Sequence, residues 1–128
     1  MLWRDGFCRI VRAPSQDYPG YCRVILNRHV REMTDLAASE RHRLMDAVYA
    51  CESALRELFR PEKVNLASFG NQVPHLHWHV IARHLDDPHF PDPVWAAPRR
   101  ASSGGARPAV SDARLGERLS ALLTRSTP

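Results

Sequence analysis

The hydrophobic positions follow two different spacings along the chain, and the first of them predicts strands. Short apolar runs rich in strand-forming residues lie at 7–11 and 21–29, with a segment containing two prolines and a glycine between them. Two further runs of the same kind lie at 64–69 and 75–82. The sequence therefore predicts two pairs of antiparallel strands.

Between these two pairs, the apolar positions recur every three or four residues. The recurring positions from Ser39 onward are Leu44, Val48, Cys51, Leu55 and Leu58. This spacing predicts an amphipathic helix, with Ser39 as its N-cap and Pro61 as its stop. The predicted order is strand, strand, helix, strand, strand, which is an α+β fold with an antiparallel sheet under one long helix.

The last third of the chain has a different character. Residues 86–108 are rich in proline, glycine and serine and carry no periodic pattern, which predicts a loop or tail. Residues 114–123 regain helical spacing, with Ser111 as a plausible cap and Gly116 as a weakening residue. We predict one domain over residues 1–90 and an extension over 91–128 that ends in a short, weakly docked helix.

Composition narrows the function classes. The 128 residues suit one domain, and the net charge of +4 favours anionic partners. The arginines are scattered and do not alternate with aromatic residues, so no nucleic-acid platform is predicted. Three cysteines without Cys-x-x-Cys spacing indicate a reducing compartment. The absence of an 18-residue apolar run excludes a membrane helix, and we expect a cytoplasmic protein.

One segment carries distinctive chemistry: HLHWHVI, in which His75, His77 and His79 alternate with apolar residues. Alternation by two on a strand puts the three imidazoles on one face and Leu76 and Trp78 on the other. Two kinds of chemistry fit. A neutral imidazole can attack phosphorus as a nucleophile, and three imidazoles can also hold Zn²⁺ with one position open to water.

The metal interpretation lacks an acidic residue within the motif to orient its ligands, although a backbone carbonyl or Asp86 could serve. A metal-dependent hydrolase therefore stays as an alternative.

The segment HLHWHVI resembles the histidine-triad (HIT) superfamily of nucleotide hydrolases and transferases. The resemblance extends upstream through GNQVP and PGYCRVILNRHV, and it covers residues 1–85. It implies an α+β fold in which two subunits join their sheets across a two-fold axis, so a homodimer is expected. It also implies a nucleotide substrate that is cleaved at its α-phosphate: a dinucleoside polyphosphate, a nucleotide conjugate or a nucleoside phosphoramidate.

The resemblance further assigns roles to residues. The middle histidine, His77, would carry the nucleotidyl group, with its other ring nitrogen held by a backbone carbonyl. His75 and His79 would support the phosphate and the leaving group, and Asn71 and Gln72 would bind near the phosphates. No cofactor is required, although a divalent cation could accompany the substrate.

Two positions depart from the family pattern. Tyr21 stands where many members have a supporting histidine, and Ala13 stands where members often place an Asp or Asn for the ribose hydroxyls. Ribose recognition would then come from elsewhere, such as Asp17 or Asn27, or be weaker. These departures leave open a second alternative, a nucleotide sensor without catalytic activity.

A few other residues are assigned from their position alone. Arg83 follows the triad strand and could bind a distal phosphate. Trp3, Phe7 and Leu26 could form an apolar slot for a nucleobase, although core packing is the stronger expectation. We interpret a further group as structural: His29, His42, His84, His89 and Trp95.

Overall fold

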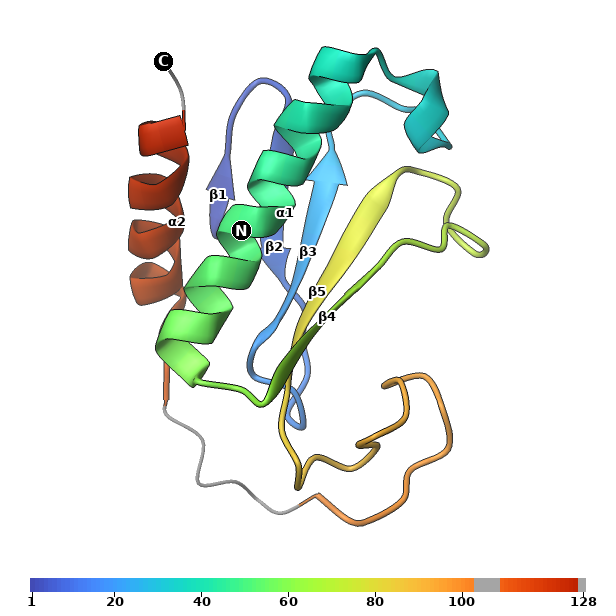
Figure 1. The fold of residues 1–128 in the computed structure, drawn as a ribbon, viewed down its shortest axis with the longest axis vertical. Helices are drawn as coiled ribbons and strands as arrows, with labels where there is room; N and C mark the ends of the chain where they lie inside the picture. The colour runs from blue at the N-terminus through green and yellow to red at the C-terminus, as the bar shows by residue number, and fades with distance from the viewer. Residues whose placement is uncertain (103–108, 127–128) are drawn as a thin grey trace.

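The computed structural model describes residues 1–102 and 109–126 (Figure 1). Its five strands are β1 (Trp3–Arg4), β2 (Cys8–Arg12), β3 (Tyr21–Leu26), β4 (Lys63–Ala67) and β5 (His77–Arg83). They form one sheet in the order β1-β2-β3-β5-β4, and every neighbouring pair is antiparallel. The predicted α+β class with an antiparallel sheet is confirmed.

The observed strands are shifted or shortened by one to three residues at most of the predicted boundaries. The two-residue strand β1 was not predicted, because Trp3 and Arg4 are too short a run to show alternation. The last strand begins at His77 instead of His75. The residues before it still bind the end of β3, since the Leu76 N–H donates to the carbonyl of Val30 and the Leu26 N–H donates to the carbonyl of Leu76.

The long helix α1 (Ala38–Phe59) crosses one face of the sheet, after a short 3₁₀ turn at Met33–Asp35 (Figure 1). Its first turn is closed by Glu40, whose carboxylate accepts the Ala37 N–H at 2.9 Å, so Ser39 is not the N-cap. The helix ends as predicted before Pro61, with Arg60 in the left-handed conformation. Its buried stripe includes four of the five predicted apolar positions: Leu44, Val48, Cys51 and Leu55.

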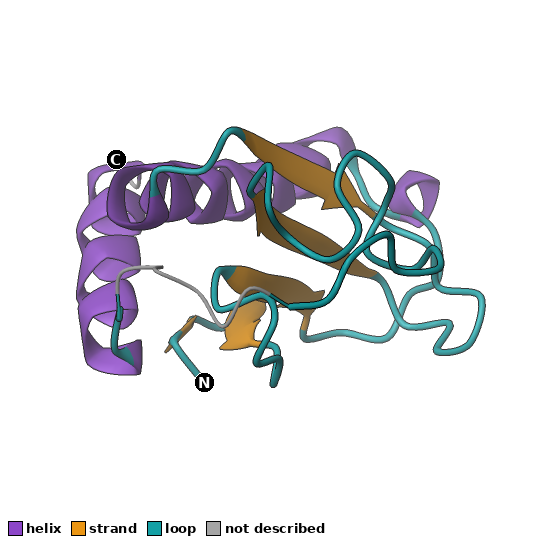
Figure 2. Ribbon diagram, turned by 90° about the horizontal axis from the view of Figure 1, so that it is seen from below, coloured by secondary structure: helices purple, strands orange, loops and turns teal. Residues whose placement is uncertain are grey.

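The second helix, α2 (Asp112–Ser126), packs beside α1 and near β1 (Figure 2). Ser111 caps it, because its hydroxyl accepts the Arg114 N–H. Leu115, Leu119 and Leu123 are buried in the main core, so the expectation of a weakly docked helix is wrong. Glycine is required at position 116 because the backbone of α2 lies close to that of Leu2: a Cβ there would be 2.8 Å from the carbonyl oxygen of Leu2.

The helices and the sheet enclose the main hydrophobic core on one side. The strands contribute alternate residues to it, such as Cys22, Val24 and Leu26 of β3. The intervening residues face the other side of the sheet, where the triad lies. Part of the predicted loop, residues 103–108, lies outside the described residues. Within the described part, no helix is long and apolar enough to cross a membrane.

Candidate active site

A cavity of about 830 Å³ opens on the sheet face opposite the helices. All three triad histidines line it. The lining also includes strand residues and the loop between β4 and β5; the full set is Arg9, Tyr21, Arg23, Ile25, Phe69, Gly70, Asn71, Gln72, Val73, His75, His77, His79 and Trp95. The cavity therefore gathers five of the seven site residues predicted from the sequence.

His77, at the start of β5, has a fixed tautomer. Its Nδ1 lies 2.6 Å from the backbone carbonyl oxygen of His75. A carbonyl oxygen can only accept, so Nδ1 must carry a proton, and in the neutral ring the lone pair is on Nε2. Ser68 holds the same strand end, because its hydroxyl donates to the His77 carbonyl at 2.7 Å. In its neutral form, the middle histidine of the cavity lining thus has Nε2 as its unprotonated nitrogen.

His75 uses its ring differently from the expectation that it supports the phosphate. Its Nε2 lies 2.5 Å from the carbonyl of Leu26, so Nε2 is the donor. Its Nδ1 lies 3.2 Å from Nδ1 of His29, which must then donate to it when both rings are neutral. Both ring nitrogens of His75 are engaged with protein groups, and the residue positions His77 through its own backbone carbonyl.

His29 therefore supports the triad through His75, a contact that sequence reasoning missed, although His29 does not itself line the cavity. It was interpreted as structural because it lies 46 positions from His75 and no spacing rule connects the two. The segment just before β5 pairs with the end of β3, and this pairing brings the two rings together.

His79 lies deeper in the cavity and is backed by Tyr21. The phenol oxygen of Tyr21 lies 2.8 Å from Nδ1 of His79. Burial is the main cause that lowers the pKa of His79 to about 4; repulsion from His77, whenever that ring is protonated, and from Arg23 acts in the same direction. The His79 ring is therefore neutral near pH 7. Burial raises the pKa of Tyr21, which keeps its hydroxyl protonated. Tyr21 can thus donate to Nδ1, which leaves the proton of His79 on Nε2.

Asn71 and Gln72 lie in the loop between β4 and β5, and both are exposed at the cavity. The loop turns at Gly70, whose φ of +70° lies in the left-handed region that suits glycine. The structure therefore places these two amides beside the triad, at the position expected from the sequence.

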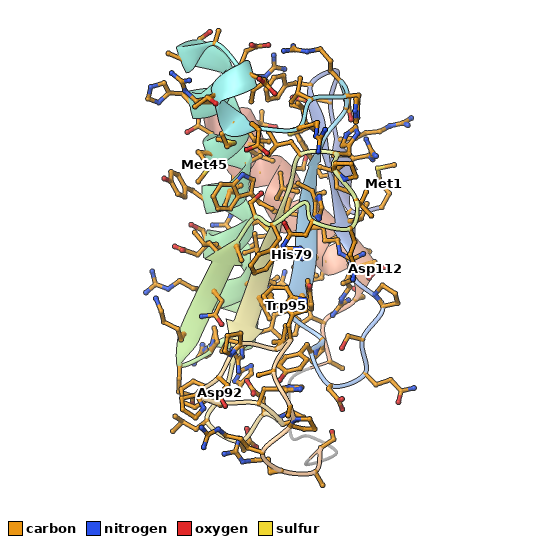
Figure 3. The ribbon with its side chains drawn as sticks, turned by 90° about the vertical axis from the view of Figure 1, so that its right-hand side faces the viewer. Met1, Met45, His79, Asp92, Trp95 and Asp112 are labelled. Carbon is orange, nitrogen blue, oxygen red and sulfur yellow. The ribbon has the colours of Figure 1, made fainter. Side chains whose placement is uncertain are left out.

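Trp95 closes the cavity together with Phe69. The two rings meet edge to face with centroids 4.8 Å apart, and the Trp95 ring lies 5.1 Å from that of His79. Figure 3 shows the labelled His79 and Trp95 next to each other on this face of the sheet. From the sequence, Trp95 was interpreted as a structural residue that holds the tail against the body, because prolines surround it. Its place in the cavity was missed because its aromatic neighbours, Phe69 and His79, are distant in the sequence.

A buried polar network anchors the segment that carries Trp95. Asp87 accepts two hydrogen bonds from the guanidinium of Arg83, at 2.8 and 3.0 Å, and one from the hydroxyl of Tyr18. Burial alone raises the pKa of Asp87, but the hydrogen bonds from Arg83 and from the backbone N–H groups of His84 and His89 outweigh it, and the net pKa lies well below its usual range.

Arg83 is consequently not in the cavity, and its predicted contact with a distal phosphate is wrong. The side chain is 2% exposed, and its remaining donors bind Asn65 and the carbonyl of Asp92. Asn27 is also outside the cavity. Its side chain fixes the turn before β2, because it donates to the carbonyl of Asp5 and accepts from Arg9.

Core packing, the stronger expectation for Trp3, Phe7 and Leu26, is confirmed, and these residues do not form an apolar slot in the cavity. Leu26 is fully buried in the main core, and Trp3 and Phe7 pack against that core. The aromatic rings of the cavity are those of Tyr21, Phe69 and Trp95 instead. Ala13 is buried on the triad side of the sheet and does not line the cavity.

A metal centre is not preformed in the described residues. Within 1–102 and 109–126, no group of three His, Cys, Asp or Glu side chains is placed to hold a metal ion. Two of the three triad rings direct a nitrogen to a backbone carbonyl, which explains why the alternating spacing does not produce a converging ligand set.

Comparison with known families agrees with the architecture and the triad. The model of the HIT domain matches residues 1–86. The chain belongs to the HIT family. The family resemblance seen in the sequence is thereby confirmed, and HIT proteins form a family of nucleotide-binding hydrolases and transferases. No curated protein matches the chain significantly.

Solved HIT structures resemble nearly the whole chain. A histidine triad protein from Marinobacter aquaeolei is 28% identical with a TM-score of 0.73, and covers 97% of this chain and 88% of its own. One from Bradyrhizobium japonicum is 26% identical with a TM-score of 0.70, at 97% and 87% coverage. One from Sinorhizobium meliloti, at 24% identity, has a TM-score of 0.69 and covers 91% and 83%.

Proposed function

We propose that this HIT protein is a nucleotidyl hydrolase or transferase that cleaves its substrate at the α-phosphate through a covalent intermediate on His77. The substrate is a dinucleoside polyphosphate, a nucleotide conjugate or a nucleoside phosphoramidate. One observation carries the proposal: the bond from Nδ1 of His77 to the His75 carbonyl leaves Nε2 with a lone pair in the cavity. A nitrogen nucleophile needs that lone pair near neutral pH.

In the first step, Nε2 of His77 attacks the α-phosphorus and forms an N–P bond. The bond from phosphorus to the oxygen or nitrogen of the leaving group breaks, and that atom keeps the electron pair and takes a proton from water. His79 donates a hydrogen bond from Nε2–H to the departing atom, because Tyr21 occupies its Nδ1. The amides of Asn71 and Gln72 bind the phosphate oxygens.

In the second step, a water molecule attacks the phosphorus and the N–P bond breaks. The nucleoside monophosphate leaves, the proton of the water passes to solvent, and the lone pair on Nε2 is restored. In a transferase, another nucleophile takes the place of the water. Neither proposed step uses a resident metal ion. A homodimer formed through sheet pairing remains a prediction.

Intact-protein mass spectrometry after a rapid quench tests the proposal. The purified protein is mixed with a diadenosine polyphosphate or with an adenosine phosphoramidate, with and without chelator, and compared with His77→Ala. We expect a mass increase of one adenylyl group that persists with chelator and is absent from the variant.

Other outcomes point to the alternatives. Activity that chelator abolishes would favour the metal-dependent hydrolase. Nucleotide binding with neither adduct nor product would favour a sensor without catalytic activity. That alternative is worth testing because Tyr21 and Ala13 both depart from the family pattern.

A further inference from the structure

Two arginines line the cavity in register with the triad, and the function proposed above gives them no role. Arg23 on β3 lies directly opposite His79 on β5. Arg9 on β2 lies opposite Ile25, which in turn lies opposite His77. Side chains at opposed positions of antiparallel strands share a face and come within about 5 Å at Cβ. The two guanidinium groups therefore extend the triad face across two further strands.

The surroundings of these arginines are free of compensating charge. No Asp or Glu lines the cavity, and in the described part of the chain neither Arg9 nor Arg23 forms an ion pair. Arg23 lies over the ring of Tyr21, with its Cζ 5.7 Å from the centroid, and Arg9 donates to the neutral amide of Asn27 at 3.1 Å. Both side chains are half-buried.

This arrangement differs from that of the arginines which stabilise the fold. Arg83, for example, is buried and holds a carboxylate with two hydrogen bonds. Two uncompensated cations in one concave, partly apolar cavity raise the local concentration of anions, and their forked donors suit phosphate oxygens. Another part of the cavity lining, made by Phe69 and Trp95, is aromatic and uncharged.

We propose that Arg9 and Arg23 form an anion subsite that binds a second negatively charged group of the substrate, next to the phosphate attacked by His77. This inference rests on the proposed function and narrows its substrate class. The cavity selects substrates with at least two adjacent anionic groups, such as phosphoanhydrides, over phosphoramidates whose leaving group is a neutral amine. The aromatic wall takes the planar part of the molecule.

Binding measurements separate this subsite from catalysis. Isothermal titration calorimetry on the full chain compares AMP with the α,β-methylene analogue of ADP, which resists cleavage at that bridge and carries one more phosphate. We expect the analogue to bind at least about tenfold more tightly than AMP, and this preference to weaken as salt rises. Arg23→Gln should remove most of the preference and Arg9→Gln part of it, and Arg23→Lys should restore some of it.

Arg114→Gln is the matched control, because Arg114 is an exposed arginine on α2 that does not line the cavity. It removes the same charge and should leave the preference unchanged. The inference is overturned if AMP and the analogue bind equally to the unmodified protein, if neither binds, or if the two cavity variants weaken both ligands by the same factor.

The two proposals fail in different ways. Loss of the His77 adduct with the binding preference intact would remove the catalytic proposal and keep the anion subsite. An adduct that forms normally, together with a binding preference for the analogue over AMP that neither arginine substitution changes, would keep the catalytic proposal and remove the anion subsite.

Discussion

The two faces of the sheet are built from the same strands but from opposite kinds of residue. On the helix side, β3 and β5 present small apolar side chains such as Cys22, Val24 and Val80, all fully buried. On the other side, the same two strands present Arg23 and His79, and a guanidinium group and an imidazole ring line the cavity there. The comparison teaches that one face holds the fold together, while the other can change its chemistry with little effect on the core.

The largest effect should come from His77→Ala. Removing the proposed nucleophile is expected to lower kcat/KM by at least about a thousandfold. His77 is only half-buried and outside the main core, so the melting temperature should stay within a few degrees of that of the unmodified protein. Steady-state kinetics and thermal unfolding test both halves, and retained activity would contradict the assignment of His77.

Asp87→Asn tests an exception to the comparison of the two sheet faces. The ion pair of Arg83 and Asp87 lies on the cavity side, yet its role is to stabilise the fold. The substitution leaves the buried guanidinium of Arg83 without its counter-ion, and we expect a loss of about 3–5 kcal/mol in the free energy of unfolding. Denaturant unfolding measures it. The control is Asp92→Asn, which breaks an exposed ion pair with Arg99 and should cost less than about 1 kcal/mol. Equal losses in the two variants would refute the distinction.

Leu44→Ala sharpens the comparison from the helix side. Leu44 is fully buried between α1 and the sheet, so its truncation should lower the free energy of unfolding by about 3 kcal/mol. Because the cavity lies on the opposite face, kcat/KM measured well below the melting temperature should stay close to that of the unmodified protein. A large fall in kcat/KM of the folded variant would show that the faces are coupled.

A smaller effect is expected from His79 as pH falls. Its pKa of about 4 in the folded protein lies below the ordinary 6.5, so the unfolded chain binds more protons between these values and stability declines with acidification. This group should account for about 2–3 kcal/mol lost between pH 7 and pH 4. His79→Gln removes the titration, so unfolding free energies across this range should decline less steeply than in the unmodified protein. Parallel curves would exclude the effect.

The features that periodicity encodes could be predicted from the sequence. The stripe of Leu44 to Leu55 and the alternating histidines have a spacing that an exposed and a buried face impose. The stop before Pro61 is equally local, because proline has no N–H to donate and disfavours a helical residue before it. Contacts between distant segments could not be predicted in this way. His29 meets His75, and Trp95 meets Phe69, because loops return over the sheet face. Arg83 was misplaced for a related reason: its partner Asp87 is near in sequence, but spacing does not reveal burial.

The close contact between Gly116 and Leu2 joins the two ends of the described chain, and it has a consequence for synthesis on the ribosome. The leucines of α2 complete a core that begins with β1 and β2, yet they are translated more than one hundred residues later. Until they emerge, part of the apolar stripe of α1 stays uncovered. A nascent chain that stalls before α2 therefore exposes apolar surface that chaperones can bind, even though all three triad histidines have already been translated.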